Sequence, residues 1–278
     1  MAFRFNFAEK TSSSSSFCNS TFEQQHNSTS LEYCTVPSNF PTGVSYETEK
    51  VIINNRRTLW KRKSVELTSK YFRVDQHCQD IISGVYEGGF KLWEGAIDLI
   101  EYLDSNDCLD VEQGLELGCG HGLPGIFALQ EGVKMDFQDF NMPVITQVLF
   151  PNIIFNDCTL KAANSLFLAG DWSCLFHCQL KEKYDLILAS EIVYRVELFP
   201  LLCNCLEYLL KDGGVAYFSG KCFYFGVGGG TEAFHSFIDS RKLSCVCVHR
   251  IQDGKSNVRE ILQVKKATVS KKYLHTEM

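Results

Sequence analysis

The chain has 278 residues, 45% of them hydrophobic, and a formal net charge of −6. This length provides for one large or two small domains, and no apolar run approaches the roughly 18 residues that a membrane-spanning helix needs. The composition excludes a membrane protein and a wholly disordered chain. Its thirteen cysteines, an odd number, favour reduced thiols in the cytosol or nucleus over a disulfide-stapled secreted scaffold.

The first 48 residues are predicted to form a disordered tail. From Thr11 to Thr48 the residues are mainly Ser, Thr, Asn and Gln, and the few apolar residues show no helical or strand period. The alternation from Phe3 to Phe7 fits a strand that adds to the folded body, a docking motif or a loose terminus, and the sequence does not decide among them. No secretory signal is expected before Glu9.

Residues 49–83 are predicted to be a basic N-terminal extension. The segment from Lys50 to Arg73 contains eight Lys and Arg residues and one acidic residue, Glu66. Its formal charge is therefore +7, and the rest of the chain carries −13. Such a charge distribution can guide association with RNA or a basic-protein complex, although the net charge of the whole chain argues weakly against nucleic-acid partners. Two basic runs within it, 56–57 and 61–63, resemble a nuclear import signal. A solvated face is the competing interpretation.

After Gly84 helical and strand patterns alternate. Apolar residues at helical spacing predict helices at 91–103, 123–130, from 143 onward, 197–210 and 232–240. Short apolar runs predict strands at 114–117, 133–137, 165–169, 184–189 and 215–220, followed by two alternating runs, 244–248 and 258–264, that would pair antiparallel. The alternation indicates that residues 84–278 form a three-layer α/β sandwich with a seven-stranded, mostly parallel sheet.

A glycine loop follows the first of these strands. Gly118, Gly120 and Gly122 let the backbone turn sharply and let a ligand approach closely. The spacing from Gly120 to Gly125 also matches the dinucleotide fingerprint, so a nicotinamide or flavin oxidoreductase is an alternative. With Glu116 in front, the loop has the more complete order acidic-x-Gly-x-Gly-x-Gly. That order resembles motif I of class I methyltransferases, whose cofactor is S-adenosyl-L-methionine.

Further polar residues come at the ends of the next three strands. Asp139 lies 21 residues after Gly118, where a carboxylate can accept both ribose hydroxyls. Asp171 lies in Gly-Asp-Trp after the third strand, where methyltransferases commonly recognise adenine. Ser190 and Glu191 follow the fourth strand. Ligands of open α/β sheets bind at the carboxyl ends of the strands, so these residues are expected to surround one pocket.

Longer segments resemble the histidine protein methyltransferase 1 family, which modifies a histidine of a large-subunit ribosomal protein. The segments that carry the resemblance are 84–94, 115–122, 137–141, 170–172, 184–194 and 224–230. Carried over by motif, the cofactor-binding residues are Leu92, Trp93, Glu94, Gly95, Ala96, Glu116, Gly118, Gly120, Gly122, Gln138, Asp139, Phe140, Gly170, Asp171, Trp172 and Ser190. This chain departs from the family at Phe140, where relatives often have Tyr, and at Cys222-Phe223, where Ala-His is usual.

Glu191 and Tyr194 are the candidate catalytic residues, and Tyr224 and Gly228 are the candidate substrate-binding residues. A histidine is mostly neutral at pH 7, so transfer requires an acceptor for one ring N–H and a group that stabilises the imidazolium that forms. We expect Glu191 to supply both. A helix cap at Glu191 is the competing interpretation. Two alternatives to the enzyme remain: a protein-lysine methyltransferase and a ribosome-binding module without turnover.

The resemblance also implies the setting of the protein. It implies methylation of a large-subunit ribosomal protein at the tele nitrogen and an effect on ribosome assembly or translation. With such a target, the basic segment is expected to contact ribosomal RNA or a pre-ribosome. The expected location is the cytoplasm and nucleus, including the nucleolus. A monomer without a membrane partner is expected. No metal is expected, because the cysteine pairs lack the spacing of a zinc site. His121, inside the glycine loop, is expected to face solvent.

Overall fold

The computed structural model describes residues 31–34, 46–63, 80–239, 241, 243–254 and 256–266. The alternating segment at residues 3–7 and the cations Lys70 and Arg73 lie outside these ranges. Within the described ranges no helix combines the length and the apolar character needed to cross a membrane.

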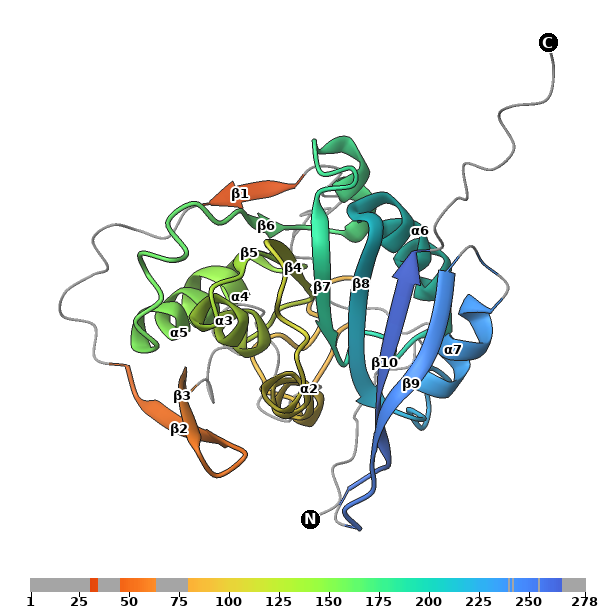
Figure 1. The fold of residues 1–278 in the computed structure, drawn as a ribbon, viewed down its shortest axis with the longest axis horizontal. Helices are drawn as coiled ribbons and strands as arrows, with labels where there is room; N and C mark the ends of the chain where they lie inside the picture. Colours follow the sequence, from red (N-terminus) through yellow and green to blue (C-terminus); the bar gives the residue numbers. More distant parts are fainter. Residues whose placement is uncertain are drawn as a thin grey trace, which may run out of the picture.

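An eight-stranded sheet forms the centre of the described part, in the order β1-β6-β5-β4-β7-β8-β10-β9 (Figure 1). The strands from β6 to β8 are parallel, whereas β1, β10 and β9 pair antiparallel with their neighbours. The strands are β1 (Glu32–Cys34), β4 (Gln113–Leu117), β5 (Lys134–Asp139), β6 (Phe167–Ala169), β7 (Tyr184–Ser190), β8 (Leu210–Lys221), β9 (Leu243–Ile251) and β10 (Arg259–Lys266). The predicted mostly parallel α/β sheet is confirmed, with one strand more than expected.

The additional strand, β1, comes from the segment that we predicted to be disordered. Glu32, Tyr33 and Cys34 pair antiparallel with residues 167–169 of β6. The prediction of disorder is therefore wrong for these three residues. Their partners lie far along the chain, and three residues within a polar stretch show no local period from which a strand could be inferred.

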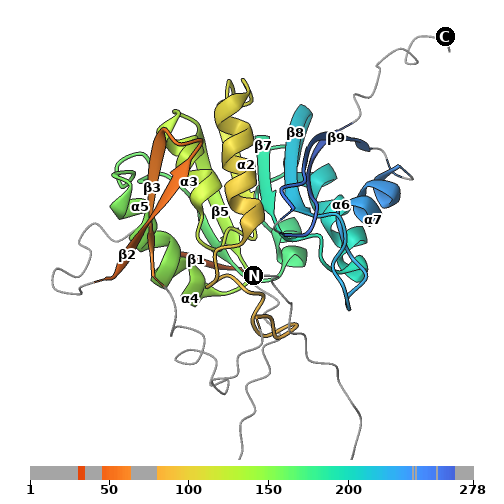
Figure 2. The same ribbon diagram turned by 90° about the horizontal axis from the view of Figure 1, so that it is seen from below.

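Two helical layers cover the two faces of the sheet, as Figure 2 shows. Along β7, Leu186 and Leu188 pack in one core with α2, α3 and α5, whereas Ile187 and Ala189 pack in a second core with α6 and α7. Successive strand residues point to opposite faces, so this alternation builds the predicted three layers. The helices are α2 (Glu94–Ser105), α3 (Leu123–Gln130), α4 (Met142–Val144), the π-helical η1 (Ile145–Leu149), α5 (Phe150–Phe155), the 3-10 helices η2 (Trp172–His177) and η3 (Val196–Leu198), α6 (Phe199–Leu209) and α7 (Thr231–Ile238).

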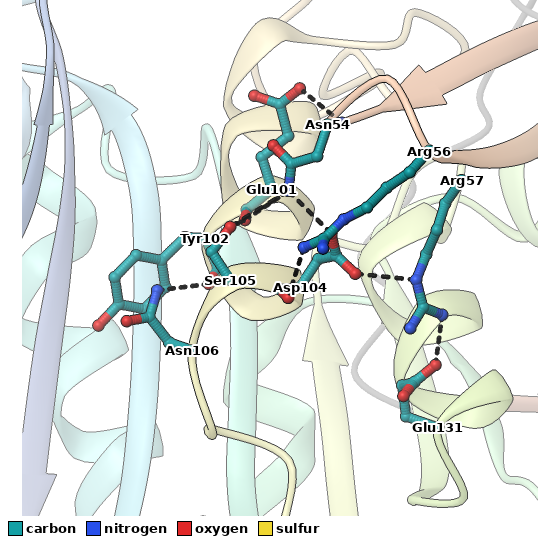
Figure 3. A network of polar contacts seen from close by, with 9 residues as sticks. All are labelled: Asn54, Arg56, Arg57, Glu101, Tyr102, Asp104, Ser105, Asn106 and Glu131. Atoms are coloured by element: carbon teal, nitrogen blue, oxygen red, sulfur yellow. Dashed lines mark hydrogen bonds and ion pairs between the residues drawn. The ribbon is translucent and has the colours of Figure 1, made fainter.

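Residues 49–62 of the basic extension form an antiparallel hairpin, β2 (Thr48–Ile53) and β3 (Arg57–Arg62), which begins at Thr48, the last residue of the segment predicted to be disordered. Figure 3 shows its turn docked on the C-terminal end of α2. Asn54 Nδ2 donates to Asp104 Oδ2 at 2.8 Å, and Arg56 and Arg57 form ion pairs with the same carboxylate at 2.9 and 2.8 Å. Arg57 also pairs with Glu131 at 2.5 Å. These cations therefore fasten the hairpin to the body.

The order of the strands places a crevice at the centre of the sheet. From β4 the chain continues to β5 and β6 on one side and then returns to β7 on the other. The loops after β4 and β7 therefore leave the sheet in opposite directions, and the carboxyl ends of these two strands form the position where such sheets bind ligands.

Candidate functional site

A cavity of about 450 Å³ opens at this crevice, within the range of about 300–1,000 Å³ that is typical of ligand pockets. Most of the predicted site residues line it: Leu92, Trp93, Ala96, Gly118, Gly120, Gly122, Asp139, Phe140, Asp171, Trp172, Ser190, Glu191 and Tyr194. The others are not part of its wall: Glu94, Gly95, Glu116, Gln138, Gly170, Tyr224 and Gly228. Their contacts show what several of them do.

The glycine loop connects β4 to α3 in a conformation that favours glycine. Gly118, Gly120 and Gly122 have φ angles of 60°, 51° and 67°. A Cβ atom at Gly118 would lie 2.7 Å from Ile192, and one at Gly122 would lie 2.1 Å from Leu149. One side of the loop packs tightly against neighbouring side chains, and the other side lines the cavity. A larger residue at Gly118 or Gly122 would therefore displace the loop.

Glu116 lies behind the loop and away from the cavity. Its Oε2 accepts the backbone N–H of Gly125 at 2.8 Å, in the first turn of α3, and burial raises the pKa of the carboxyl well above its ordinary value. Direct contact with a cofactor, which we expected, does not follow from this position. Glu116 already accepts the N–H of Gly125, one of the first-turn donors of α3 to which a dinucleotide pyrophosphate would bind. This arrangement argues against the oxidoreductase alternative.

Gln138 holds two loops of the site together from beneath. Its Oε1 accepts the N–H of Gly118 at 3.2 Å and the indole N–H of Trp172 at 2.9 Å, and its Nε2 donates to the carbonyl of Gly170 at 2.8 Å. Gln138 is fully buried. It therefore positions the loops after β4 and β6 relative to each other.

Asp139 presents a buried carboxyl at the end of β5. Its Oδ2 accepts the N–H of Gly120 at 2.9 Å, and its Oδ1 accepts the N–H of Asn141 at 3.0 Å. Burial raises its pKa to about 6, while these backbone donors oppose the rise. Since a carboxylate has about four acceptor positions, Asp139 can still accept hydroxyl groups of a ligand.

Glu191 joins three parts of the site. It has a left-handed backbone, with φ of 58°, which is uncommon for a residue other than glycine and typical of functional positions. Its Oε1 accepts the N–H of Gly95 in α2 at 3.1 Å, and its Oε2 accepts the hydroxyl of Tyr224. Burial raises the pKa of Glu191, and the Tyr224 hydrogen bond opposes the rise. Gly95 and Tyr224 therefore act on the site by orienting this carboxyl.

A segment before α2, residues 83–90, closes one side of the cavity and is called the strap below. Glu87 of the strap accepts the hydroxyl of Tyr194 and forms an ion pair with Arg195 at 3.2 Å. Arg195 also donates to the hydroxyl of Ser83. Glu87 and Arg195 were not among the site residues expected from the sequence. Glu87 lies within residues 84–94, one of the segments that carried the family resemblance, and this resemblance was the sequence feature from which its role could have been predicted.

The second glycine-rich loop packs behind the candidate catalytic residues. Gly228 forms an isolated β-bridge with Arg195, and Gly230 donates its N–H to Val193 at 2.8 Å. A Cβ atom at Gly229 would lie 2.2 Å from the carbonyl carbon of Tyr194. The loop thus fixes the backbone at 193–195, whereas the predicted contact of Gly228 with a substrate stays a prediction.

His121 is buried, contrary to our expectation that it faces solvent. Only 3% of the residue is exposed, and Nε2 lies 3.0 Å from the carbonyl oxygen of Phe90. Burial lowers its pKa to about 4. The prediction failed because the sequence gives no sign that the strap folds over the glycine loop.

The chemistry of the cavity fits S-adenosylmethionine. Asp139 can accept ribose hydroxyls, and the Trp172 and Phe140 side chains offer flat apolar surfaces for a base. Among the described residues that line the cavity, the Lys and Arg side chains are Lys91 and Arg195, and each already pairs with a carboxylate. Such a site suits a ligand that carries an ammonium and a sulfonium better than one with a pyrophosphate.

Comparison with known proteins agrees with this site. The profile of a family described as "Lysine methyltransferase" matches residues 78–223, more than half of the chain. A histidine protein methyltransferase 1 homolog of Dictyostelium discoideum is 42% identical over 66% of this chain and 60% of its own length. The Bos taurus homolog is 38% identical over 59% of this chain and 52% of its own length. The Schizosaccharomyces pombe histidine protein methyltransferase 1 is 32% identical over 65% of this chain and 67% of its own length.

The matched part of the chain spans about half to two thirds of the length of these curated relatives. The strap, the glycine loop and the segment that contains Glu191 and Tyr194 lie within residues 78–223, which the family profile matches. The chain therefore belongs to this methyltransferase family and, within it, to the histidine protein methyltransferase 1 group, whose cofactor is S-adenosyl-L-methionine.

Proposed function

We propose that the chain is an S-adenosylmethionine-dependent protein methyltransferase that acts on a histidine side-chain nitrogen. The observation that carries this proposal is Glu191, a buried carboxyl at the end of β7 whose oxygens are fixed by the Gly95 N–H and the Tyr224 hydroxyl. It stands at the edge of a cavity that fits the cofactor. The names of the relatives point to the same acceptor.

The residues of the chain position the reactants. Bound S-adenosylmethionine supplies a methyl group on a positively charged sulfur. The glycine loop, Asp139 and Trp172 would hold the cofactor, and the strap excludes water from one side. Glu191 keeps acceptor positions for one imidazole N–H, which selects the tautomer with a lone pair on the other nitrogen. The same carboxylate opposes the positive charge that develops on the ring, so it acts more strongly in the transition state than on the neutral substrate.

Histidine suits this site better than lysine. A lysine side chain has an ordinary pKa near 10.4 and must lose a proton before transfer, whereas a histidine near 6.5 is mostly neutral at pH 7. Glu87, the other carboxylate beside Tyr194, is paired with Arg195 and is therefore poorly placed to act as a base. Lysine remains the second candidate because the matching family profile is described as a lysine methyltransferase.

On the resemblance alone, we propose a large-subunit ribosomal protein as the target, the tele nitrogen as the site of transfer, and an effect on ribosome assembly or translation. The cytoplasm and nucleus, including the nucleolus, are the proposed location, and a monomer is the proposed state. Contact with ribosomal RNA through the basic extension would need residues other than Arg56 and Arg57, which pair with Asp104.

The test is methyl transfer from radiolabelled S-adenosylmethionine to large-subunit ribosomal proteins, followed by acid hydrolysis and amino-acid analysis. Label in tele-methylhistidine supports the proposal. Label in methyl-lysine supports the second candidate, and no label with intact cofactor binding supports a module without turnover. The Glu191→Gln variant should lose about 10²–10³ in kcat while it binds S-adenosylhomocysteine normally, whereas the exposed Glu112→Gln variant should behave as wild type. Most of the activity retained in Glu191→Gln would remove this residue from the mechanism.

A further inference from the structure

One asparagine side chain connects the N-terminal hairpin to the glycine loop. Asn152 of α5 is fully buried, and its Oδ1 accepts the backbone N–H of Arg62 in β3 at 2.6 Å. Its Nδ2 donates to the carbonyl oxygen of His121 at 2.9 Å and lies 3.4 Å from Nδ1 of the same residue. Asn152 therefore bonds at the same time to the edge of the hairpin and to the loop that lines the cofactor cavity.

His121 extends this connection to the strap. Because the amide nitrogen of Asn152 can only donate, Nδ1 of His121 accepts, and Nε2 carries the hydrogen that the carbonyl of Phe90 receives at 3.0 Å. The two backbones also come close together here, since a Cβ atom at Gly120 would lie 3.4 Å from the carbonyl oxygen of Gly89. The imidazole ring of His121, which belongs to the glycine loop, therefore links this loop to the strap. These two segments form two walls of the cavity.

A neighbouring asparagine binds the same strand without reaching the loop. Asn156, one helical turn after Asn152, accepts the N–H of Trp60 at 2.9 Å and donates to the Trp60 carbonyl at 2.7 Å. The two asparagines satisfy backbone groups along β3, which otherwise pairs on its other side with β2. Asn156 provides a natural comparison, because it shares the attachment to the hairpin and lacks the contact with His121.

We propose that the β2–β3 hairpin is a working part of the cofactor site, and that Asn152 and His121 are positioning residues that hold the glycine loop and the strap in the conformation that binds S-adenosylmethionine. The ion pairs of Arg56 and Arg57 with Asp104 keep the far end of the hairpin docked on α2. The basic extension thereby contributes to cofactor affinity. This inference goes beyond the proposed function, since it concerns the cofactor and holds for any acceptor.

The experiment measures the binding of S-adenosylhomocysteine to the full chain by calorimetry, beside the melting temperature without ligand. Asn152→Ala and His121→Leu each remove hydrogen bonds on which the loop depends, so we expect Kd to rise about three- to tenfold. Asn156→Ala should lower the melting temperature and leave Kd within about twofold of wild type. His121→Gln should recover affinity, because its amide can donate to Phe90 and accept from Asn152.

Equal effects of Asn152→Ala and Asn156→Ala on Kd would overturn the inference, because the hairpin would then act only through general stability. Unchanged affinity in His121→Leu would also overturn it. If Asn152→Ala does not fold, the contrast between His121→Leu and His121→Gln decides. The proposed function fails separately: wild-type chain that binds S-adenosylhomocysteine but labels no histidine contradicts that function and leaves this inference standing.

Discussion

Arg259 of β10 and Asp98 of α2 form a buried ion pair whose loss should destabilise the protein strongly. Arg259 Nε lies 2.5 Å from Asp98 Oδ2, and Nη2 lies 3.2 Å from Oδ1, with side chains 6% and 9% exposed. Removing one partner of such a pair costs about 3–5 kcal/mol, because the other charge stays buried without compensation. The Arg259→Met variant should therefore lose about 3–5 kcal/mol of unfolding free energy, a large share of the roughly 5–15 kcal/mol of a typical domain.

Loss of the ion pair should also disturb the candidate site, because Asp98 lies one helical turn after Gly95, and the N–H of Gly95 donates to Glu191. Urea unfolding followed by circular dichroism gives the midpoint and slope for each variant. The double variant Arg259→Met/Asp98→Leu should recover most of the loss, because it leaves no fully buried charge without a partner. Glu94 and Asp253, which also form ion pairs with Arg259, have side chains 33% and 38% exposed and can be solvated.

A matched control is the exposed pair of Lys134 and Glu112, which are 2.8 Å apart with side chains 69% and 74% exposed. Lys134→Met should cost less than about 1 kcal/mol. If Arg259→Met costs no more than Lys134→Met, or if the double variant is as unstable as the single one, the buried ion pair does not stabilise the protein in this way.

Three further predictions concern the cavity. In Tyr224→Phe the carboxyl of Glu191 loses a hydrogen bond that lowers its pKa, so the acid limb of kcat/KM against pH should move to higher pH, and an unmoved limb would count against the role of Glu191. Burial raises the pKa of Asp139 to about 6, so this carboxyl is ionised at pH 8 and gains a proton as the pH falls through 6. Calorimetry should then show S-adenosylhomocysteine binding weakening below about pH 6, and Asp139→Asn should bind weakly at every pH without this step. Gly229→Ala would place a Cβ atom 2.2 Å from the Tyr194 backbone, so thermal unfolding should show a lower Tm and methyl transfer should fall. A normal Tm in that variant would show that the loop can move aside.

The sequence was sufficient for features that depend on neighbouring residues. Apolar periodicity over a few residues predicted every strand and α-helix from α2 to β10, although β8 begins at Leu210, where a helix was expected to end, and the 3-10 helix η2 was not predicted. The position of Glu191 at the end of β7 followed from the same pattern, since the carboxyl edge of a parallel sheet is known once its strands are known.

Features that depend on distant partners could not be read from the sequence. The basic extension was expected to be solvated or to contact RNA, but Arg56 and Arg57 meet their carboxylate, Asp104, across a long separation in the chain. His121 was expected to face solvent because it is a polar residue in a loop, but the strap covers it. Glu116 has the motif position of a cofactor ligand, yet its carboxyl binds the start of α3. In each case tertiary packing decides the environment of the side chain.

The attachment of the hairpin to α5 has a consequence for the order in which the molecule assembles. The bonds from β3 to Asn152 and Asn156 join residues 90 and 96 positions apart. A ribosome adds about 5–20 residues each second, so the hairpin emerges roughly 5–20 seconds before its partners on α5 are synthesised. During that interval β3 can pair with β2, but α5 has not yet been synthesised. The hairpin therefore cannot take its place against α5, and support the glycine loop through Asn152, until about 90 further residues have been made.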